Sequence, residues 1–258
     1  MAILDMAATI RAPDKRLVFS GKRPPVHVRQ DIEQFFDMDQ DRSTYTPGHI
    51  DKSELDEANQ LDCQESLVSV YADGRPDPLL TTDVKTLRTA ATSDAESLST
   101  GTNGGDCPTE VLEPIGTTVV SAHSTQQMIV ASRHIERRAH EIESGEIHVC
   151  FQRLSLLGED LRTVIQYNLL AEQGVDVHIY GFADHDLPEV KKPTVHPGWT
   201  EELADSWVVA YDDTDDKTGS QTAALVAQEQ ASDEYAGFWT FESKPTENVI
   251  KYMTSTYQ

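Results

Sequence analysis

The chain has few cysteines, and no two of them lie close together in the sequence. Cys63, Cys107 and Cys150 are the only three among 258 residues, and no Cys-x-x-Cys pair occurs. An odd number of widely spaced cysteines provides neither the even set of a disulfide framework nor the paired spacing of a cysteine zinc site. We expect Cys150, which falls within a predicted strand, to be a small buried residue.

Lysine is also scarce, and acidic residues outnumber basic ones. The chain has 9 lysines against 24 aspartates, and its formal net charge is −23. This charge disfavours binding to nucleic acid or to an anionic membrane, because both require clustered cations. Many carboxylates with few lysines are typical of proteins that work in molar salt, where the Debye length falls to ~3 Å and self-repulsion is screened. We therefore expect a halophilic protein, with an ordinary acidic protein as the alternative.

Long apolar runs are missing as well. The first residues, MAILDMAATIRAPDK, contain acidic side chains and a polar break before any sufficient apolar stretch. No segment approaches the ~18 consecutive apolar residues of a membrane span. We therefore expect no signal peptide, no membrane association and a cytoplasmic location.

Motifs of catalysis and nucleotide binding are absent from the sequence. It contains no Gly-x-Ser-x-Gly, Gly-x-Gly-x-x-Gly, P-loop or His-Glu-x-x-His. The acidic run Asp212–Asp216 fits a calcium loop poorly, because the sixth position is Lys217 and the twelfth is Ala223. His148 and His178 fall on two strands that could be adjacent, but two imidazoles without a nearby third ligand are a weak indication of a metal site. We expect no catalytic residue, no cofactor and no metal.

The N-terminal part contains short apolar segments separated by polar ones. Strands are predicted at Leu17–Phe19 and Leu67–Tyr71, and a helix over His27–Met38. Residues 39–64 are polar and acidic, so any strand there is expected at a sheet edge. The segment TSDAESLSTGTNGGDCP predicts a flexible insertion at about 92–108. Because the part before it has few apolar residues, we expect a single α/β domain over 1–258 and not two domains.

The most regular pattern lies between His123 and Ser155, where a helix over 125–144 leads into a strand over 145–152. Gly145 occupies the position of a glycine that ends the helix. The buried stripe of the helix is predicted to comprise Met128, Ala131, Ile135, Ala139 and Ile142. Its opposite face is predicted to hold Arg133, Glu136, Arg137, Arg138 and His140.

Further helices and strands alternate after this segment. A helix over 158–173 is predicted to turn Leu161, Val164, Ile165 and Leu169 inward. Strands are predicted at 175–180, 206–211, 222–228 and 235–241, with a helical turn at 199–203 and a terminal helix from near Pro245. This order predicts an α/β fold with a mixed, partly parallel central sheet flanked by helices, a C-terminal antiparallel hairpin and a terminal helix.

Several of these segments carry a family resemblance. Met-x-x-x-Ser-Arg-x-Ile-Glu-x-x-Ala, followed by Phe-Gln-Arg-Leu-Ser, resembles the DICT family, as do the segments 174–181, 223–229 and 235–241. The resemblance runs from about Thr118 to Tyr252. This sensory domain is named for its fusion to diguanylate cyclases and two-component proteins, and stand-alone copies are common in haloarchaea. The resemblance implies an archaeal, non-enzymatic domain for signal transduction that binds a small ligand or a signalling partner protein.

The candidate ligand-binding residues are those that carry this signature, together with one aromatic side chain. If the helix edge meets the strand end Phe151–Arg153, arginine donors and a carboxylate converge there and could bind an anionic or polar small molecule. A structural ion-pair network that ties helix to sheet is the alternative. The candidates are Ser132, Arg133, Glu136, Arg137, Gln152, Arg153 and Trp239. A small-molecule enzyme that uses Glu136 with His148 or His178 as an acid/base pair is the alternative function.

Overall fold

The computed structural model describes residues 3–46, 66–92, 109–159, 161–184, 190–213 and 221–258. Their contacts divide the chain into two compact units, one made of Met1–Arg11 with Val119–Gln258 and the other of Ala12–Thr118. This division concerns packing and does not test whether either unit folds alone, so a single domain over 1–258 stays a prediction. The predicted insertion at about 92–108 lies outside the described residues, apart from Thr92.

The unit Ala12–Thr118 is built on a four-stranded sheet in the order β2-β1-β3-β4. β1 pairs in parallel with β2 and antiparallel with β3, which is antiparallel to β4. The expected edge position of any strand within 39–64 is confirmed by β2. The elements are β1 Lys15–Gly21, α2 Val26–Phe35, η1 Gln40–Arg42, β2 Ser43–Thr46, β3 Ser66–Ala72, β4 Leu80–Asp83, α3 Val84–Thr92, α5 Thr109–Leu112 and η4 Glu113–Ile115.

The other unit is built on a seven-stranded sheet in the order β5-β11-β10-β9-β6-β7-β8. β6, β7 and β8 run parallel, whereas β9, β10 and β11 are antiparallel neighbours, as expected for a mixed sheet. The strands are β5 Thr118–His123, β6 Glu146–Arg153, β7 Asp176–Phe182, β8 Thr194–Gly198, β9 Ser206–Asp213, β10 Gln221–Ala231 and β11 Glu234–Thr240. The helices are α1 Ile3–Thr9, α6 Thr125–Ile142, α7 Leu154–Glu159, α8 Leu161–Gln173, α9 Glu201–Asp205 and α10 Ser243–Tyr257.

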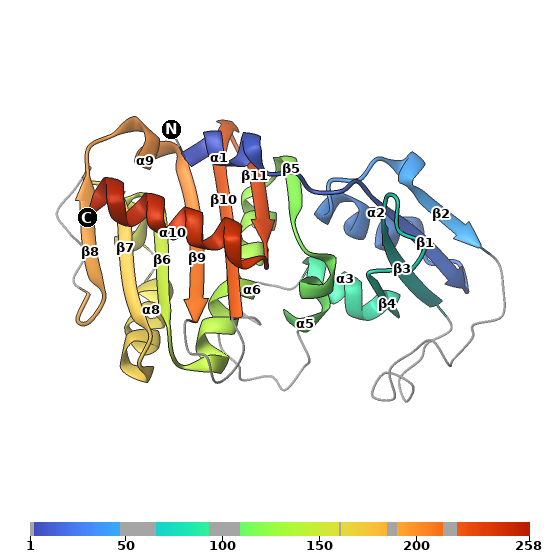
Figure 1. Ribbon diagram of the computed structural model, residues 1–258, viewed down its shortest axis with the longest axis horizontal. Coiled ribbons are helices and arrows are strands. Elements are labelled where there is room, and N and C mark those ends of the chain that lie inside the picture. The colour runs from blue at the N-terminus through green and yellow to red at the C-terminus, as the bar shows by residue number, and fades with distance from the viewer. Residues whose placement is uncertain (1–2, 47–65, 93–108, 160, 185–189, 214–220) are drawn as a thin grey trace. The chain divides into compact units, whose positions relative to one another are not determined.

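Helices cover both faces of this sheet (Figure 1). α6 and α8 pack on one face, and α10 crosses the other face together with α1 and α9. On the α10 face, Val249, Ile250 and Met253 of the helix pack against strand residues such as Val208 and Phe238. The predicted α/β class with a C-terminal hairpin and a terminal helix is therefore confirmed. The sequence patterns did not predict α1, β4 or β8.

Helix α6 begins with a capping box, in which Ser124 and Gln127 satisfy each other's backbone N–H groups. The left-handed residue at its end is Glu143, with φ 58°, and not Gly145 as predicted. Gly145 also has a positive φ of 81°, and a Cβ there would collide with the backbone carbonyl oxygen of Asp212. Gly145 therefore serves close packing of this loop on the neighbouring strand.

Two predictions about helix faces are wrong. Glu136 and Arg138 are predicted on the outer face of α6, but they are only 3% and 7% exposed. α8 packs beside α6 and encloses Glu136, whereas Arg138 donates to the backbone carbonyl of Thr222 on β10 and lies over the ring of Phe241. On α8, Leu161, Ile165 and Leu169 were expected inward, yet they are exposed. Its buried residues are Thr163, Tyr167 and Leu170. Apolar spacing misled here because the buried carboxylate of Glu136 requires hydrogen-bond donors from α8.

No helix in the described part of the chain combines the length and the apolar character that a bilayer crossing requires.

Candidate functional site

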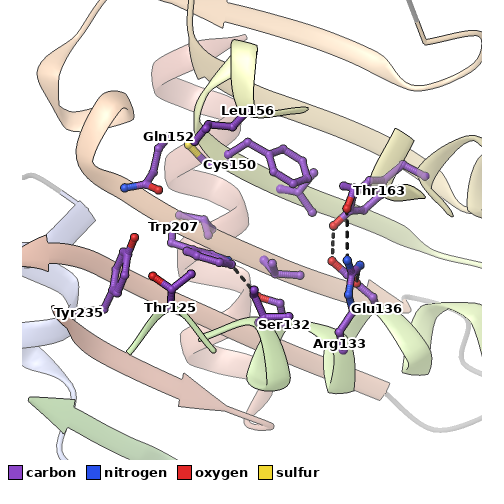
Figure 2. A pocket seen from close by; sticks show the side chains of 16 residues that line it. Thr125, Ser132, Arg133, Glu136, Cys150, Gln152, Leu156, Thr163, Trp207 and Tyr235 are labelled. Carbon is purple, nitrogen blue, oxygen red and sulfur yellow. Dashed lines mark hydrogen bonds and ion pairs between the residues drawn. The ribbon is translucent and has the colours of Figure 1, made fainter. Parts of the chain in front are cut away.

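A cavity of about 310 Å³ lies between α6 and the sheet (Figure 2). Its floor consists of two cross-strand pairs of β6 and β9, Val149 with Val209 and Phe151 with Trp207. Neighbours in register point to the same face of a sheet, so all four side chains turn towards α6. Ile129 lies on the helix side of the cavity. The central part of the cavity is therefore apolar, with both aliphatic and aromatic side chains.

One end of the cavity contains a buried ionic network. Glu136 accepts hydrogen bonds from the guanidinium of Arg133, from Tyr167 Oη and, at 2.9 Å, from Gln166 Nε2. Arg133 also donates to Gln166 Oε1 at 2.5 Å and to Thr163 Oγ1 at 3.2 Å. The side chains of Arg133 and Glu136 are only 13% and 4% exposed. The carboxylate of Glu136 is therefore held by three donors from two helices.

Tyr167 is the neutral member of this network. Burial raises the pKa of its hydroxyl well above the ordinary value, and the adjacent negative charge of Glu136 adds to the increase. Tyr167 is thus a protonated donor at neutral pH, and its ring lies edge-on to Phe151 at 5.5 Å between centroids. The network as a whole combines one positive and one negative side chain, so it presents little net charge to the cavity.

The other end of the cavity is lined by dipolar groups. Trp207 Nε1 donates to Ser132 Oγ at 2.9 Å, which links the floor to α6. Gln152 Nε2 donates to Glu229 Oε2 at 3.3 Å. The ring of Tyr235 stands edge-on to Trp207 with centroids 5.6 Å apart. Hydroxyl, amide and indole groups therefore surround this end.

Gln152 reaches the cavity through an irregularity in β6. The pairing of β6 with β7 shifts between Cys150 and Arg153, and Gln152 has a φ of 58°. A β-bulge adds one residue to a strand and redirects the side chains that follow it. A left-handed glutamine is uncommon, and such strained residues are frequent beside functional sites.

The structure brings together four of the seven candidate residues. Ser132, Arg133, Glu136 and Gln152 line the cavity. The remaining candidates, Arg137, Arg153 and Trp239, are not among its lining residues.

Each of these three has a neighbour elsewhere. Arg137 Nε bonds Glu141 at 2.7 Å on the solvent side of α6, and Arg153 lies over the ring of Phe182. Trp239 of β11 is buried, and its ring lies edge-on to that of Phe241.

Several lining residues were not among the candidates. Thr163 and Tyr167 come from the side of α8 that the apolar spacing placed outward, so no pattern pointed to them. Trp207 is recognisable in the sequence only as an aromatic residue of a strand, for which core packing is the default. Tyr235 is an aromatic residue of the same kind, with stacking of a planar heterocycle beside the arginines as the alternative. The register of β6 against β9 is what places Trp207 on the cavity floor.

The acid/base pair considered for an enzyme is not assembled here. Glu136 lies against α8, whereas His148 bonds Tyr180 Oη at 2.9 Å and Glu146 Oε2 at 3.0 Å on the α10 face. His148 and Val149 are consecutive residues of one strand, so their side chains point to opposite faces. Burial raises the pKa of the Cys150 thiol to about 12, which makes it a poor nucleophile.

The described residues contain one group suited to a metal ion. Glu146, His148 and His178 place one ligand atom each within 4.8 Å of one another. This group lies on the α10 face and is separate from the cavity under α6.

Comparison with known proteins gives little guidance. No family model and no curated protein matches the chain. Among solved structures, a polyphosphate kinase from Porphyromonas gingivalis aligns with a TM-score of 0.34 and 10% identity, over 98% of this chain and 47% of that one. The chain thus spans about half the length of that protein, and a similarity this distant carries no argument about fold or activity.

Proposed function

We propose that the chain is a non-enzymatic sensory domain that binds a small planar molecule in the cavity between α6 and the sheet. The observation that carries this proposal is the cavity of about 310 Å³, with an apolar floor and polar groups at both ends. Small-molecule sites typically have ~300–1,000 Å³, a mainly apolar lining and a few placed polar groups. The role agrees with what the resemblance to the DICT family implies.

The lining favours an uncharged aromatic ligand. Phe151, Trp207, Tyr167 and Tyr235 offer ring faces and edges on which a planar heterocycle can stack. Arg133 is the basic residue of the lining, and Glu136 already neutralises it. An anion would therefore gain little net attraction and would lose its hydration. A neutral heterocycle with ring N–H or carbonyl groups fits both polar ends better than the anionic ligand that the arginines alone suggest.

Ligand binding in the cavity would affect a partner protein through the packing of α6 on the sheet. A ligand in the cavity contacts α6 and the sheet together, so binding stabilises that arrangement by ~2.7 kcal/mol at a concentration of 100 times the Kd. A signalling partner would then recognise α6 by its position or its rigidity. The partner, a cytoplasmic location and a halophilic archaeal source belong to the proposal through the resemblance and the charge of −23.

Ligand binding can be tested with tryptophan fluorescence in molar KCl. Purine, pterin and indole compounds are titrated while tryptophan emission is followed in a Trp199→Phe background, and the purified protein is examined by native mass spectrometry for a retained molecule. We expect saturable binding that raises the melting temperature. Ile129→Trp fills the cavity from α6 and should abolish binding in a folded protein.

Leu169→Trp is the matched control, because Leu169 lies on the exposed side of α8 and should leave binding unchanged. If no retained molecule is found and no probe shifts emission or melting, the cavity is only a packing gap and the proposal is wrong.

A further inference from the structure

Two rows of potential metal ligands lie side by side on the α10 face of the sheet. In the first row, Glu146 of β6 has Asp176 of β7 and Asp212 of β9 as its register partners. In the second row, two residues further along each strand, His148 pairs with His178. Residues two apart on a strand share a face, so the carboxylates and the imidazoles project from the same side.

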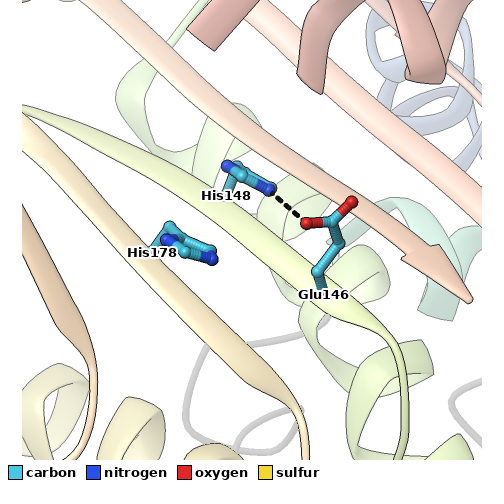
Figure 3. Close-up of side chains that lie close together, drawn as sticks. All are labelled: Glu146, His148 and His178. Carbon is cyan, nitrogen blue, oxygen red and sulfur yellow. Dashed lines mark hydrogen bonds and ion pairs between the residues drawn. The ribbon is translucent and has the colours of Figure 1, made fainter. Parts of the chain in front are cut away.

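The imidazole nitrogens face the carboxylates. His148 Nε2 lies 3.0 Å from Glu146 Oε2, and His178 Nε2 lies 3.3 Å from Asp176 Oδ2. The two rings are stacked with centroids 4.6 Å apart and an interplanar angle of 11° (Figure 3). Two nitrogens and at least one carboxylate oxygen are thereby directed to the same region.

The other nitrogen of each ring already has a partner. His148 Nδ1 lies 2.9 Å from Tyr180 Oη, and His178 Nδ1 lies 3.0 Å from His196 Nε2. Tyr180 in turn accepts a hydrogen bond from Gln258 at 2.8 Å. Metal-binding histidines usually have such an outer partner on the second nitrogen, which fixes the ring and directs its free lone pair. Here both rings have that arrangement, with Nε2 as the available ligand atom.

The carboxylate row also has unfavourable electrostatics without a cation. Like charges directly opposite each other on neighbouring strands are destabilising. Glu146, Asp176 and Asp212 stand opposite one another in this way on three neighbouring strands. A bound cation would offset this repulsion.

We propose that Glu146, His148 and His178 bind a divalent transition-metal ion of the Zn²⁺ class. Two imidazoles with one carboxylate suit Zn²⁺, whereas Ca²⁺ and Mg²⁺ require mostly oxygen ligands. Tetrahedral Zn²⁺ with bonds of ~2.0–2.2 Å needs ligand atoms roughly 3.4 Å apart. The three ligand atoms now lie within 4.8 Å of one another, so metal binding requires the two stacked rings to turn towards each other.

Access and coordination follow from the exposure of the ligands. His148 is fully buried, the side chain of Glu146 is 36% exposed, and that of Asp176 is 70% exposed. The ion therefore enters from the carboxylate side, and Asp176 or water completes its coordination. The site ties β6 to β7 and is independent of ligand binding under α6.

The test uses the full chain, stripped with a chelator and kept in molar KCl. Zn²⁺ is titrated by calorimetry, and Co²⁺ is added in parallel because its visible absorption reports tetrahedral coordination. We expect one equivalent to bind. His178→Gln and Glu146→Gln should each weaken binding by ~100-fold or more, since loss of a ligand exceeds the ~10–100-fold typical of an outer partner.

His140→Gln is the matched control, because it removes one exposed histidine of α6 and should leave the affinity unchanged. Circular dichroism of the metal-free variants verifies that each is folded. Three outcomes would overturn the proposal: no stoichiometric binding by the wild-type chain, equal losses in His178→Gln and His140→Gln, or full displacement of Zn²⁺ by millimolar Mg²⁺ or Ca²⁺.

Discussion

Strand β6 presents different chemistry to its two sides. Towards α6 it contributes the apolar side chains Val149 and Phe151, and the charged groups on that side come from helices. Towards α10 it contributes Glu146 and His148, and there the helix provides the apolar cover. The carboxylate of Glu136 on α6 is paired by α6 and α8, whereas His148 on β6 is paired by Glu146 of the same strand and by Tyr180, a diagonal neighbour on β7. The two faces should therefore respond differently to substitution.

The largest expected effect is on the α6 face. Glu136→Ala removes a buried carboxylate and leaves Arg133 and Tyr167 without their common acceptor. Breaking a buried pair in this way is expected to lower the free energy of unfolding by ~3–5 kcal/mol. Denaturant unfolding in molar KCl, followed by circular dichroism, measures the change.

Glu141→Ala is the control for that substitution. Glu141 lies on the same helix and forms an exposed ion pair with Arg137, so its loss should change stability by at most ~1 kcal/mol. Equal effects of the two substitutions would show that the Glu136 network is ordinary solvated surface.

The second expected effect concerns the two sides of α8. Leu170 is buried and Leu169 is 45% exposed, although they are adjacent in sequence. Leu170→Ala should cost ~2–5 kcal/mol, whereas Leu169→Ala should stay within ~0.5 kcal/mol. Thermal unfolding of both variants gives the comparison. A larger loss of stability in Leu169→Ala than in Leu170→Ala would support the inward orientation that the apolar spacing predicted for Leu169.

A smaller loss of stability is expected when the hydrogen bond between Trp207 on the cavity floor and Ser132 on α6 is removed. Ser132→Ala leaves the half-buried indole N–H of Trp207 without its acceptor, at a cost of ~0.5–1.5 kcal/mol. The fluorescence emission of Trp207 should also shift. It is measured in a Trp199→Phe background, because Trp199 is the most exposed of the three tryptophans. Ser255→Ala on α10, an exposed position, is the matched control. An unchanged emission would show that the bond does not form in solution.

The smallest effect is expected at the carboxylate row. The folded chain holds the pKa of Asp212 above its ordinary value, so the ionised form is disfavoured at neutral pH. Asp212→Asn should therefore raise stability by ~0.2–1 kcal/mol at pH 7. The gain should shrink as the pH falls through the raised pKa, because the wild-type carboxyl then becomes neutral as well. It should also shrink between about 0.1 M and about 2 M KCl, since salt screens the repulsion. Melting curves across pH and salt check both trends, and a gain independent of both would contradict the electrostatic cause.

The sequence predicted the secondary structure of the larger unit well, because its strands and α6 have clear periodicities. Met128, Ala131, Ile135 and Ala139 are buried as the stripe in α6 required. The faces of α8 were not predictable in the same way. Their orientation depends on Glu136, whose burial becomes apparent only when α6 and α8 are packed together.

The two candidate sites differ in how far the sequence could locate them. Ser132, Arg133, Glu136 and Gln152 were predicted because they lie in the segment that resembles the DICT family, three on one helix and the fourth on the next strand. The metal ligands were considered and set aside for want of a third ligand. Glu146 is only two residues from His148, but its contribution depends on the parallel register that places His178 beside both. Register between strands is a long-range property that local periodicity does not contain.

Which side chain of β6 lines one end of the cavity depends on the number of residues between Cys150 and Arg153. In an unbroken strand, Gln152 would point to the same side as His148 and Cys150, and Arg153 would point towards α6. Because of the extra residue between Cys150 and Arg153, Gln152 lines the cavity instead and Arg153 pairs with Phe182. Deleting Gln152 would leave Phe151 facing α6 and Arg153 paired with Phe182 as it is now, so the cavity would lose its amide group while the register of β6 upstream stayed in place. A single-codon deletion could thus remove one polar group from the end of the cavity while Val149 and Phe151 keep their places on its floor.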